Sequence, residues 1–200
     1  MKKNIAFFDF DGTICAKDSF LDFILFCCGK FRMAVGLFYL SPFVVAYLLK
    51  LYPNYKLKEH FFKHFLADYL PFELEKKGEI YAETRLTAFI YEDAMAKILW
   101  HKNNHHRVII ITASSSIWLS AWCKKHHLEL ISTQFEIIEG KYSEKILGKN
   151  CEGLEKLAIV KKILAEEKDA ISYGYGNTKA DLPFLNALQH KHYKAFGKKG

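Results

Sequence analysis

The nine residues from Ile5 to Thr13, IAFFDFDGT, decide how this 200-residue chain folds. Residues 5–8 form an apolar run that predicts a buried strand, and two carboxylates follow it at alternate positions. If strand geometry continues, Asp9 and Asp11 share one face of the sheet, because strand side chains alternate with a period of two. Buried carboxylates are costly without a cationic partner, and Mg²⁺ prefers oxygen ligands. The stretch therefore predicts either a metal site with a nucleophilic carboxylate or an ordinary strand that ends in a turn at Gly12.

Two more apolar runs, at 107–112 and 170–174, predict further strands, and helical patterns separate the runs. Strands that alternate with helices indicate an α/β fold with a parallel sheet. In open α/β sheets the ligand crevice lies beyond the carboxyl ends of the strands. We therefore expect Asp9, Thr112 and Asp181 to lie at that edge of the sheet.

Four motifs occur in a fixed order along the chain. They are DFDGT at 9–13, the hydroxyl of Thr112, a lysine within GLEK at 153–156, and GNTKAD at 176–181. This order resembles the haloacid dehalogenase-like superfamily of aspartate-nucleophile phosphatases, and most closely its phosphoserine phosphatase-like and phosphatidylglycerophosphatase C-like subfamily. That subfamily inserts a helical cap after the first motif.

The resemblance implies a Rossmann-like parallel sheet core with an inserted α-helical cap. The catalytic core would comprise residues 1–15 and 96–200, and the cap residues 16–95. Closure of such a cap excludes water and selects the substrate.

The resemblance also implies roles for individual residues. Asp9 matches the nucleophile and Asp11 the general acid/base, and both would also serve as ligands of Mg²⁺. Thr112 and Ala113 match the loop that binds the phosphoryl group. Asp18 matches an acid at the entry to the cap that contributes to substrate recognition.

Two further motifs complete the implied site. Lys156 is the better match to the phosphate-binding lysine, and Lys149 is the weaker candidate. Asp181 matches the second acid of the last motif, and it would contribute to the Mg²⁺ site. The first acid of that motif is replaced by Asn177 here. An amide carbonyl is still an oxygen ligand, so we expect weaker metal binding at Asn177 rather than none.

Composition limits the classes of protein that fit. Half of the residues are apolar, the net charge is +7, and the five cysteines form no paired motif for zinc. An odd number of cysteines without such spacing predicts a reduced, cytoplasmic setting. Carboxylates at Asp9 and Asp11 interrupt the apolar stretch that an export signal needs. Because no basic-aromatic stripe or binding module is present, we expect no nucleic-acid partner.

The predicted cap contains an uncharged segment, residues 33–49, with basic residues on both sides. We expect Ser19 to cap a helix that ends at Gly29, and Ser41-Pro42 to break the later apolar run. The segment is either a cap hairpin buried against the core or a surface that meets lipid. The second interpretation places the protein peripherally at the inner face of the membrane.

The resemblance implies a phosphomonoester substrate, but its identity depends on the cap. An apolar cap and a positive net charge favour a lipid phosphate such as phosphatidylglycerophosphate. Phosphoserine or another small soluble ester is the alternative, for which Arg85 is a candidate carboxylate receptor by placement alone. The substitution at Asn177 motivates a third reading, a catalytically silent relative that binds a membrane or a partner.

Overall fold

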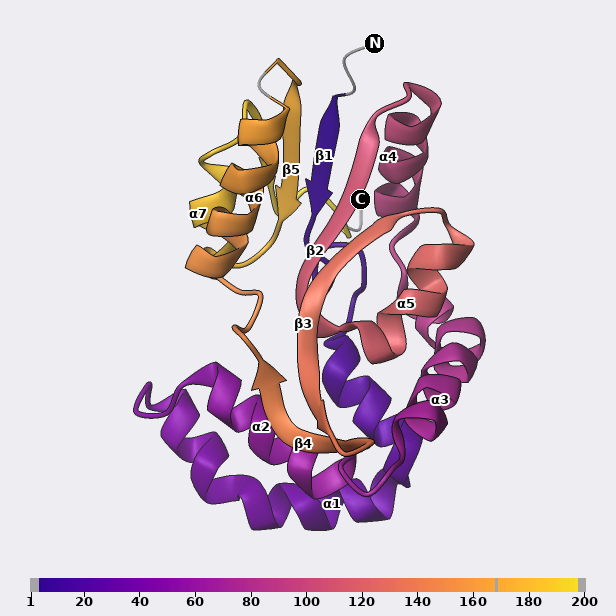
Figure 1. Ribbon diagram of the computed structural model, residues 1–200, viewed down its shortest axis with the longest axis vertical. Coiled ribbons are helices and arrows are strands. Elements are labelled where there is room, and N and C mark those ends of the chain that lie inside the picture. The colour runs from indigo at the N-terminus through magenta and orange to yellow at the C-terminus, as the bar shows by residue number, and fades with distance from the viewer. Residues whose placement is uncertain (1–3, 168, 198–200) are drawn as a thin grey trace.

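A six-stranded sheet forms the centre of the protein, shown as a computed structural model in Figure 1 that describes residues 4–167 and 169–197. The strand order is β4-β3-β2-β1-β5-β6. The strands are β1 (Ile5–Phe8), β2 (Arg107–Ser115), β3 (Glu129–Ile138), β4 (Lys141–Leu147), β5 (Ser172–Gly176) and β6 (His190–Tyr193). Neighbouring strands are parallel except β3 and β4, which are antiparallel. The predicted α/β class is confirmed, with β4 as the exception to the parallel pattern.

Helices cover both faces of the sheet and one of its ends. They are α1 (Ser19–Leu48), α2 (Asn54–Phe65), α3 (Pro71–Thr84), α4 (Glu92–Asn103), α5 (Ser116–Lys125), α6 (Leu154–Glu166) and α7 (Leu182–Leu185), with short 3₁₀ turns η1 (Leu86–Phe89) and η2 (Lys179–Asp181). Successive side chains of β1 enter different cores. Ala6 and Phe8 belong to the core that includes residues of α1 to α5, whereas Ile5 and Phe7 belong to the core beneath α6 and α7. Burial on both faces explains why the strand is continuously apolar.

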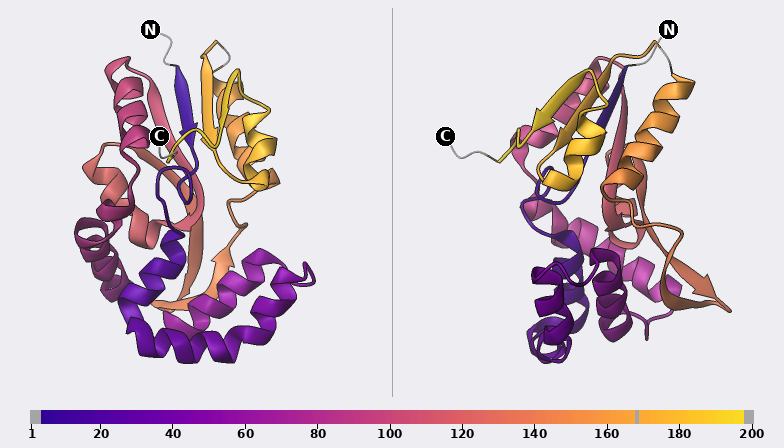
Figure 2. Two further views of the ribbon diagram at one scale, coloured as in Figure 1. Left: turned by 180° about the vertical axis from the view of Figure 1, so that it is seen from behind. Right: turned by 90° about the vertical axis from the view of Figure 1, so that its left-hand side faces the viewer.

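The helices α1, α2 and α3 connect β1 to β2 and gather at the end of the sheet to which β1 and β5 point (Figures 1 and 2). The hairpin of β3 and β4 extends to the same end and contacts α2. There Phe62 of α2 stacks on Phe135 of β3 with ring centroids 3.7 Å apart. The inserted helices therefore rest on the carboxyl edge of the sheet, where a ligand crevice is expected.

The N-cap of helix α1 lies one residue earlier than predicted. Asp18, and not Ser19, is the N-cap, because its side chain accepts a hydrogen bond from the Leu21 N–H at 3.0 Å. Gly29 interrupts the helix as expected, with a positive φ of 75° that favours glycine. The chain resumes helical geometry beyond Gly29, so two helical segments meet there at a kink.

The predicted break at Ser41-Pro42 is wrong, because α1 continues through Pro42. Proline has no N–H to offer the carbonyl four residues earlier, which is Phe38. The hydroxyl of Ser41 donates to the Phe38 carbonyl at 2.7 Å instead. This local hydrogen bond satisfies the carbonyl that the proline leaves free and lets the helix continue.

Of the two alternatives for residues 33–49, the hairpin buried against the core does not fit the structure. Residues 33–48 lie within one helix, and its outward face is exposed, with Phe31 and Phe38 each 84% exposed. Gly36 and Leu40 are buried, and Gly36 lies against Phe65 of α2. By length and composition, α1 is the one helix of the described residues that could cross a membrane.

Candidate active site

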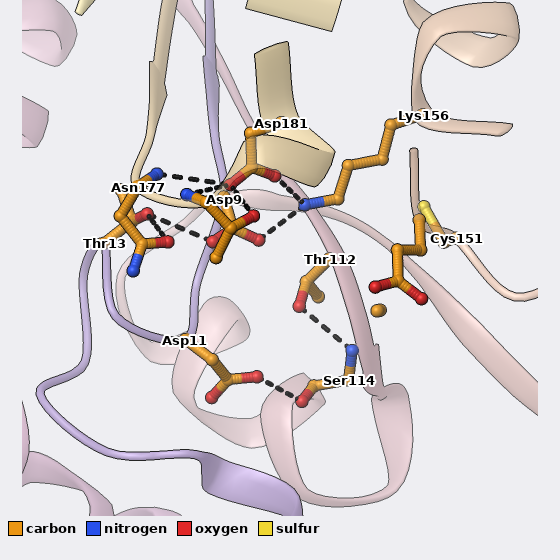
Figure 3. Close-up of polar contacts among 12 residues, drawn as sticks. Asp9, Asp11, Thr13, Thr112, Ser114, Cys151, Lys156, Asn177 and Asp181 are labelled. Carbon is orange, nitrogen blue, oxygen red and sulfur yellow. Dashed lines mark hydrogen bonds and ion pairs between the residues drawn. The ribbon is translucent and has the colours of Figure 1, made fainter. Parts of the chain in front are cut away.

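Asp9 lies directly beyond β1 in a buried position at the centre of Figure 3. Its N–H bonds to the Tyr175 carbonyl of β5 at 2.9 Å, which anchors the backbone at the sheet edge. One carboxylate oxygen, Oδ1, lies 2.6 Å from Lys156 Nζ. The other, Oδ2, accepts a hydrogen bond from the Thr13 hydroxyl at 3.0 Å. Burial raises the pKa of Asp9, and Lys156 opposes that shift only in part.

Lys156, in the first turn of α6, bridges Asp9 and Asp181 (Figure 3). Its Nζ lies 2.8 Å from Asp181 Oδ1. Although burial opposes it, the two carboxylates raise the pKa of Lys156. Lys149, the weaker sequence candidate, is exposed and pairs with Glu155 instead. The structure therefore brings Lys156, and not Lys149, to Asp9.

Asp181 is buried and most of its acceptor capacity is in use. Burial alone would raise its pKa, but Lys156 and the Thr178 hydrogen bonds lower it. Its Oδ2 accepts from the N–H groups of Asn177 and Thr178 and from the Thr178 hydroxyl. Asp181 thus orients both Lys156 and the loop that carries Asn177.

Asp11 does not share a strand face with Asp9, because β1 ends at Phe8 and the chain then turns. The turn needs Gly12, whose φ is +74° and which lies so close to Asn177 that a Cβ would sit 2.1 Å from Nδ2. The Asp11 carboxylate accepts from the Ser114 hydroxyl at 2.5 Å and from the Ser19 N–H at 2.7 Å. Burial, with a contribution from the negative charge of Asp18, raises the pKa of Asp11 to about 7. A carboxyl group with this pKa can donate and accept a proton near neutral pH.

The loop that carries Thr112 and Ala113 owes its shape to a bulge. The register of β2 against β3 shifts between Thr112 and Ser115, so Ala113 and Ser114 have no partners on β3. Bulges of this kind redirect side chains at the edge of a sheet. Ala113 and Ser114 consequently line the same cavity as Asp9, while the Thr112 hydroxyl accepts from the Ser114 N–H at 3.0 Å.

A cavity of about 560 Å³ joins these residues. At its polar end lie the side chains of Asp9, Asp11, Thr112 and Lys156, together with Asp18, which caps α1. Its remaining wall is largely apolar and comes from α1 and α2, namely Phe20, Leu21, Leu37, Val44, Tyr47, Leu48, Leu57 and Phe61. The cavity can therefore hold a molecule that is polar at one end and apolar at the other.

The donor set at Asp9 suits a small hard cation. Asp9 and Asp181 share one lysine, which leaves a negative charge without a counterion in a buried place. Asn177 Oδ1 and Asp9 Oδ2 both face the Thr13 hydroxyl, at 3.2 and 3.0 Å. No group of three His, Cys, Asp or Glu side chains in the described residues is arranged to hold a metal. Mg²⁺ fits such a site, because it commonly binds one or two carboxylates and keeps several waters.

Two polar residues of the cavity escaped sequence reasoning. Ser114 follows Thr112 within the second motif, and that position was the available signal for its contact with Asp11. Lys58 lies in α2, 55 residues before Ala113, and donates to the Ala113 carbonyl at 2.7 Å. No local pattern distinguishes Lys58 from the other lysines of its helix, since only the packing of α2 on the sheet edge brings it to the cavity.

Arg85 does not reach the cavity. Its guanidinium forms two hydrogen bonds with the Asp22 carboxylate, at 2.8 and 2.7 Å. Arg32 pairs with Asp68, and Arg107 pairs with Glu129. None of the three arginines lines the cavity, so the expectation that Arg85 receives a substrate carboxylate is not supported by its position.

Comparisons with known proteins give one family match and several proteins of similar sequence or fold. The family model described as haloacid dehalogenase-like hydrolase matches residues 6–186. Protein CicA of Caulobacter vibrioides is 26% identical over 191 residues, which are 94% of this chain and 85% of that protein. The crystal structure of a Bordetella pertussis Tohama I protein of unknown function superposes with a TM-score of 0.80 at 22% identity, covering 94% of this chain and 88% of that one. A phosphoserine phosphatase, solved as a phospho-aspartyl intermediate analogue, gives a TM-score of 0.65 at 18% identity, covering 96% and 86%.

Proposed function

The chain belongs to the haloacid dehalogenase-like hydrolase family, and from that premise we propose that it is a Mg²⁺-dependent phosphomonoester hydrolase with Asp9 as its nucleophile. The observation that carries the proposal is the meeting of Asp9, Asp11 and Lys156 at the polar end of one cavity. With the Thr112 hydroxyl, these groups come from three segments that are distant in the sequence: residues 9–11, Thr112 and Lys156. Phosphoryl transfer requires such positioning of a nucleophile, a proton donor and positive charge.

In the proposed reaction, Asp9 attacks the phosphorus atom and the bond to the leaving oxygen breaks. Asp11 gives its proton to that oxygen, and an aspartyl-phosphate forms on Asp9. Asp11 then removes a proton from a water molecule, which attacks the same phosphorus atom. Inorganic phosphate leaves and both carboxyl groups return to their initial state.

Other groups of the chain hold the phosphoryl oxygens. The Thr112 hydroxyl and backbone N–H groups near Asp11 and Ala113 suit oxygens that gain negative charge in the transition state. Lys156 orients Asp9 through its 2.6 Å contact. Asp9 and Asn177 would hold Mg²⁺, with Asp11 and Asp181 as further predicted ligands, and the bound ion supplies positive charge to the phosphoryl oxygens.

The apolar wall of the cavity favours a lipid phosphate, such as phosphatidylglycerophosphate, over phosphoserine. A free amino acid would meet Leu37, Val44 and Leu48 with a charged carboxylate and ammonium, which is unfavourable. No arginine lines the cavity to receive that carboxylate in a two-pronged contact, and its basic residues are Lys17, Lys58 and Lys156. An acyl chain would bury its surface against the same residues at about 25 cal/mol per Å².

A lipid substrate requires access to a membrane, and α1 offers a surface for it. The exposed face of α1 carries apolar residues at helical spacing, and a further one follows at its C-cap. We call these residues the outer stripe: Phe31, Val35, Phe38, Val45 and Leu49. Basic residues adjoin the outer stripe, and the net charge is +7. We propose that a cytoplasmic protein attaches peripherally to an anionic membrane surface through the outer stripe.

The inserted residues 16–95 would act as the cap over a core of residues 1–15 and 96–200. Helices α1 and α2 form the apolar wall of the cavity, which is the position a substrate-selecting cap requires. The proposed boundary at residues 95 and 96 falls inside α4, Glu92–Asn103. The boundary between cap and core is therefore better placed before α4, so that the helix stays whole.

The proposed activity is tested by phosphate release from a panel of esters, with Mg²⁺ and with EDTA. The panel contains phosphoserine and a micellar lipid phosphate, and wild type is compared with Asp9→Asn. We expect Mg²⁺-dependent release that Asp9→Asn abolishes and that is fastest with the lipid ester. Fastest release from phosphoserine would replace the substrate assignment, and no release by folded wild type would support the silent relative.

A further inference from the structure

Lys58 is a buried lysine whose nitrogen contacts no carboxylate of the described residues. Its side chain belongs to a residue that is only 9% exposed, and it lines the cavity that contains Asp9. Burial lowers the pKa of Lys58, and the negative charge of nearby Glu152 opposes that shift. Nζ donates to the Ala113 carbonyl at 2.7 Å and to Asn150 Oδ1 at 3.1 Å. Both acceptors are neutral, and no carboxylate of the described residues lies within 4.0 Å of this nitrogen. An ammonium buried in this way is costly unless an anion joins it.

The other buried lysine of the cavity differs in this respect. The charge of Lys156 is shared by Asp9 and Asp181, at 2.6 and 2.8 Å. The ammonium of Lys156 is therefore already paired with carboxylates when a phosphate dianion arrives. Lys58 keeps one N–H donor for the phosphate, because an ammonium has three N–H donors and the described acceptors occupy two of them.

We propose that Lys58 binds the phosphoryl group of the substrate and stabilises its charge in the transition state, an inference that rests on the proposed phosphatase function. Its contact with Ala113 places the ammonium at the loop that presents Thr112 to the same group. Because Lys58 comes from α2 and Ala113 from β2, the phosphate site is complete only when α2 is packed on the sheet edge. Substrate binding and the seating of the inserted helices are thereby coupled.

A purely structural contact is the competing explanation, and α2 offers a matched control. Lys63 also joins α2 to the core, through an exposed ion pair of 2.8 Å with Glu144 of β4, remote from the cavity lining. Lys63→Met removes the same charge and another contact between α2 and the core. Only Lys58→Met should also remove a phosphate ligand, while Lys58→Arg restores the charge.

The experiment measures the Kd of inorganic phosphate in the presence of Mg²⁺, and kcat and KM for the best ester, with melting temperatures to verify folding. We expect Lys58→Met to weaken phosphate binding at least tenfold and to lower kcat/KM about 10²-fold, the loss typical of one transition-state donor. Lys58→Arg should stay within about tenfold of wild type, and Lys63→Met within about twofold. If Lys58→Met does not fold, Lys58→Gln takes its place.

Two outcomes separate this inference from the proposed function. In the first, wild type hydrolyses an ester, and Lys58→Met binds phosphate and hydrolyses the ester as well as Lys63→Met does. That outcome would overturn the role of Lys58 and leave the phosphatase standing. Wild type that hydrolyses no ester, yet binds phosphate in a Lys58-dependent manner, would overturn the phosphatase and leave Lys58 as an anion ligand. Equal losses in Lys58→Met and Lys63→Met would identify a structural contact and also overturn the inference.

Discussion

At the scale of single residues, Asp9 and Asp11 are the same type of side chain, and we propose a different role for each. Burial raises the pKa of both carboxyl groups. Asp9 has the ammonium of Lys156 at 2.6 Å, whereas Asp11 contacts only a hydroxyl and an N–H. The cationic partner suits Asp9 to the proposed attack on phosphorus, and the surroundings of Asp11 suit it to the proposed transfer of a proton. The environment of each residue, and not its type, creates this division.

A pH profile tests the assignment of Asp11. Its pKa is raised to about 7, and a general acid must be protonated, so kcat/KM for an alkyl phosphate should fall as the pH rises above about 7. Asp11→Asn should lower this rate by about 10²–10⁴-fold and remove the descending limb. The loss should be smaller for p-nitrophenyl phosphate, whose leaving group needs no proton. Equal losses for both esters would exclude Asp11 as the proton donor.

The amide at Asn177 gives a second prediction at this scale. Asn177→Asp adds a negative charge beside Asp9 Oδ2, so half-saturation of activity should require about tenfold less Mg²⁺. Asn186→Asp, which adds the same charge on the exposed end of α7, serves as the control. A titration of activity with Mg²⁺ measures both variants. If Asn177→Asp needs the same or a higher Mg²⁺ concentration for half-saturation, Asn177 is not a ligand of the metal.

At the scale of elements, the first turn of α1 is tied to the end of α3. Asp22 receives two hydrogen bonds from Arg85 and one from Tyr81 at 3.2 Å. Burial alone would raise the pKa of Asp22, but the Arg85 guanidinium lowers it below the usual value of 3.8. The arginine that sequence placement suggested for substrate binding thus holds the inserted helices together.

Removal of the Asp22 charge should destabilise the protein. Asp22→Asn leaves Arg85 without its partner, and because Arg85 is one third exposed we expect about 2 kcal/mol, below the roughly 3–5 kcal/mol typical of fully buried pairs. Since the folded-state pKa is depressed, the stabilisation is present above pH 3.8 and is lost as the pH falls below it. Urea unfolding at several pH values measures both effects. Asp68→Asn, which breaks the exposed pair with Arg32, should change stability by less than about 1 kcal/mol, and a similar loss in both variants would contradict the argument.

At the scale of the whole molecule, α1 is apolar on two sides that serve different purposes. Leu37, Val44 and Leu48 line the cavity, while the outer stripe faces away from the sheet. If the outer stripe binds a membrane, as we propose, α1 joins that surface to the cavity without a further element. The kink at Gly29 separates this part of α1 from the capped first turns near Asp11.

Binding to vesicles tests the outer stripe. The double variant Phe31→Glu/Phe38→Glu should reduce cosedimentation with anionic phospholipid vesicles at least tenfold, because burial of one phenylalanine contributes about 1.5–3 kcal/mol. Turnover of a soluble ester should be unchanged. Phe72→Glu, which replaces an exposed phenylalanine of α3, is the matched control. Equal vesicle binding by all the proteins would contradict membrane attachment. A wild-type dimer that only the double substitution dissociates would contradict it as well.

The sequence by itself determined the features that depend on local pattern. The apolar runs predicted β1, β2 and β5, because strand burial is a short-range property. The motifs selected Asp9, Thr112 and Lys156, which the structure brings to one cavity. The hairpin of β3 and β4 was missed, since its strands alternate and gain stability only from contacts such as Phe62 with Phe135.

Only the tertiary structure decided how distant residues meet. It brought Lys58 to Ala113, assigned Arg85 to Asp22, and left the outer stripe of α1 exposed. A lysine or an apolar residue has the same local pattern whether it lies on a surface or in a cavity. Its partner is chosen by the packing of α1 and α2 on the sheet edge, an interaction between segments far apart in the chain.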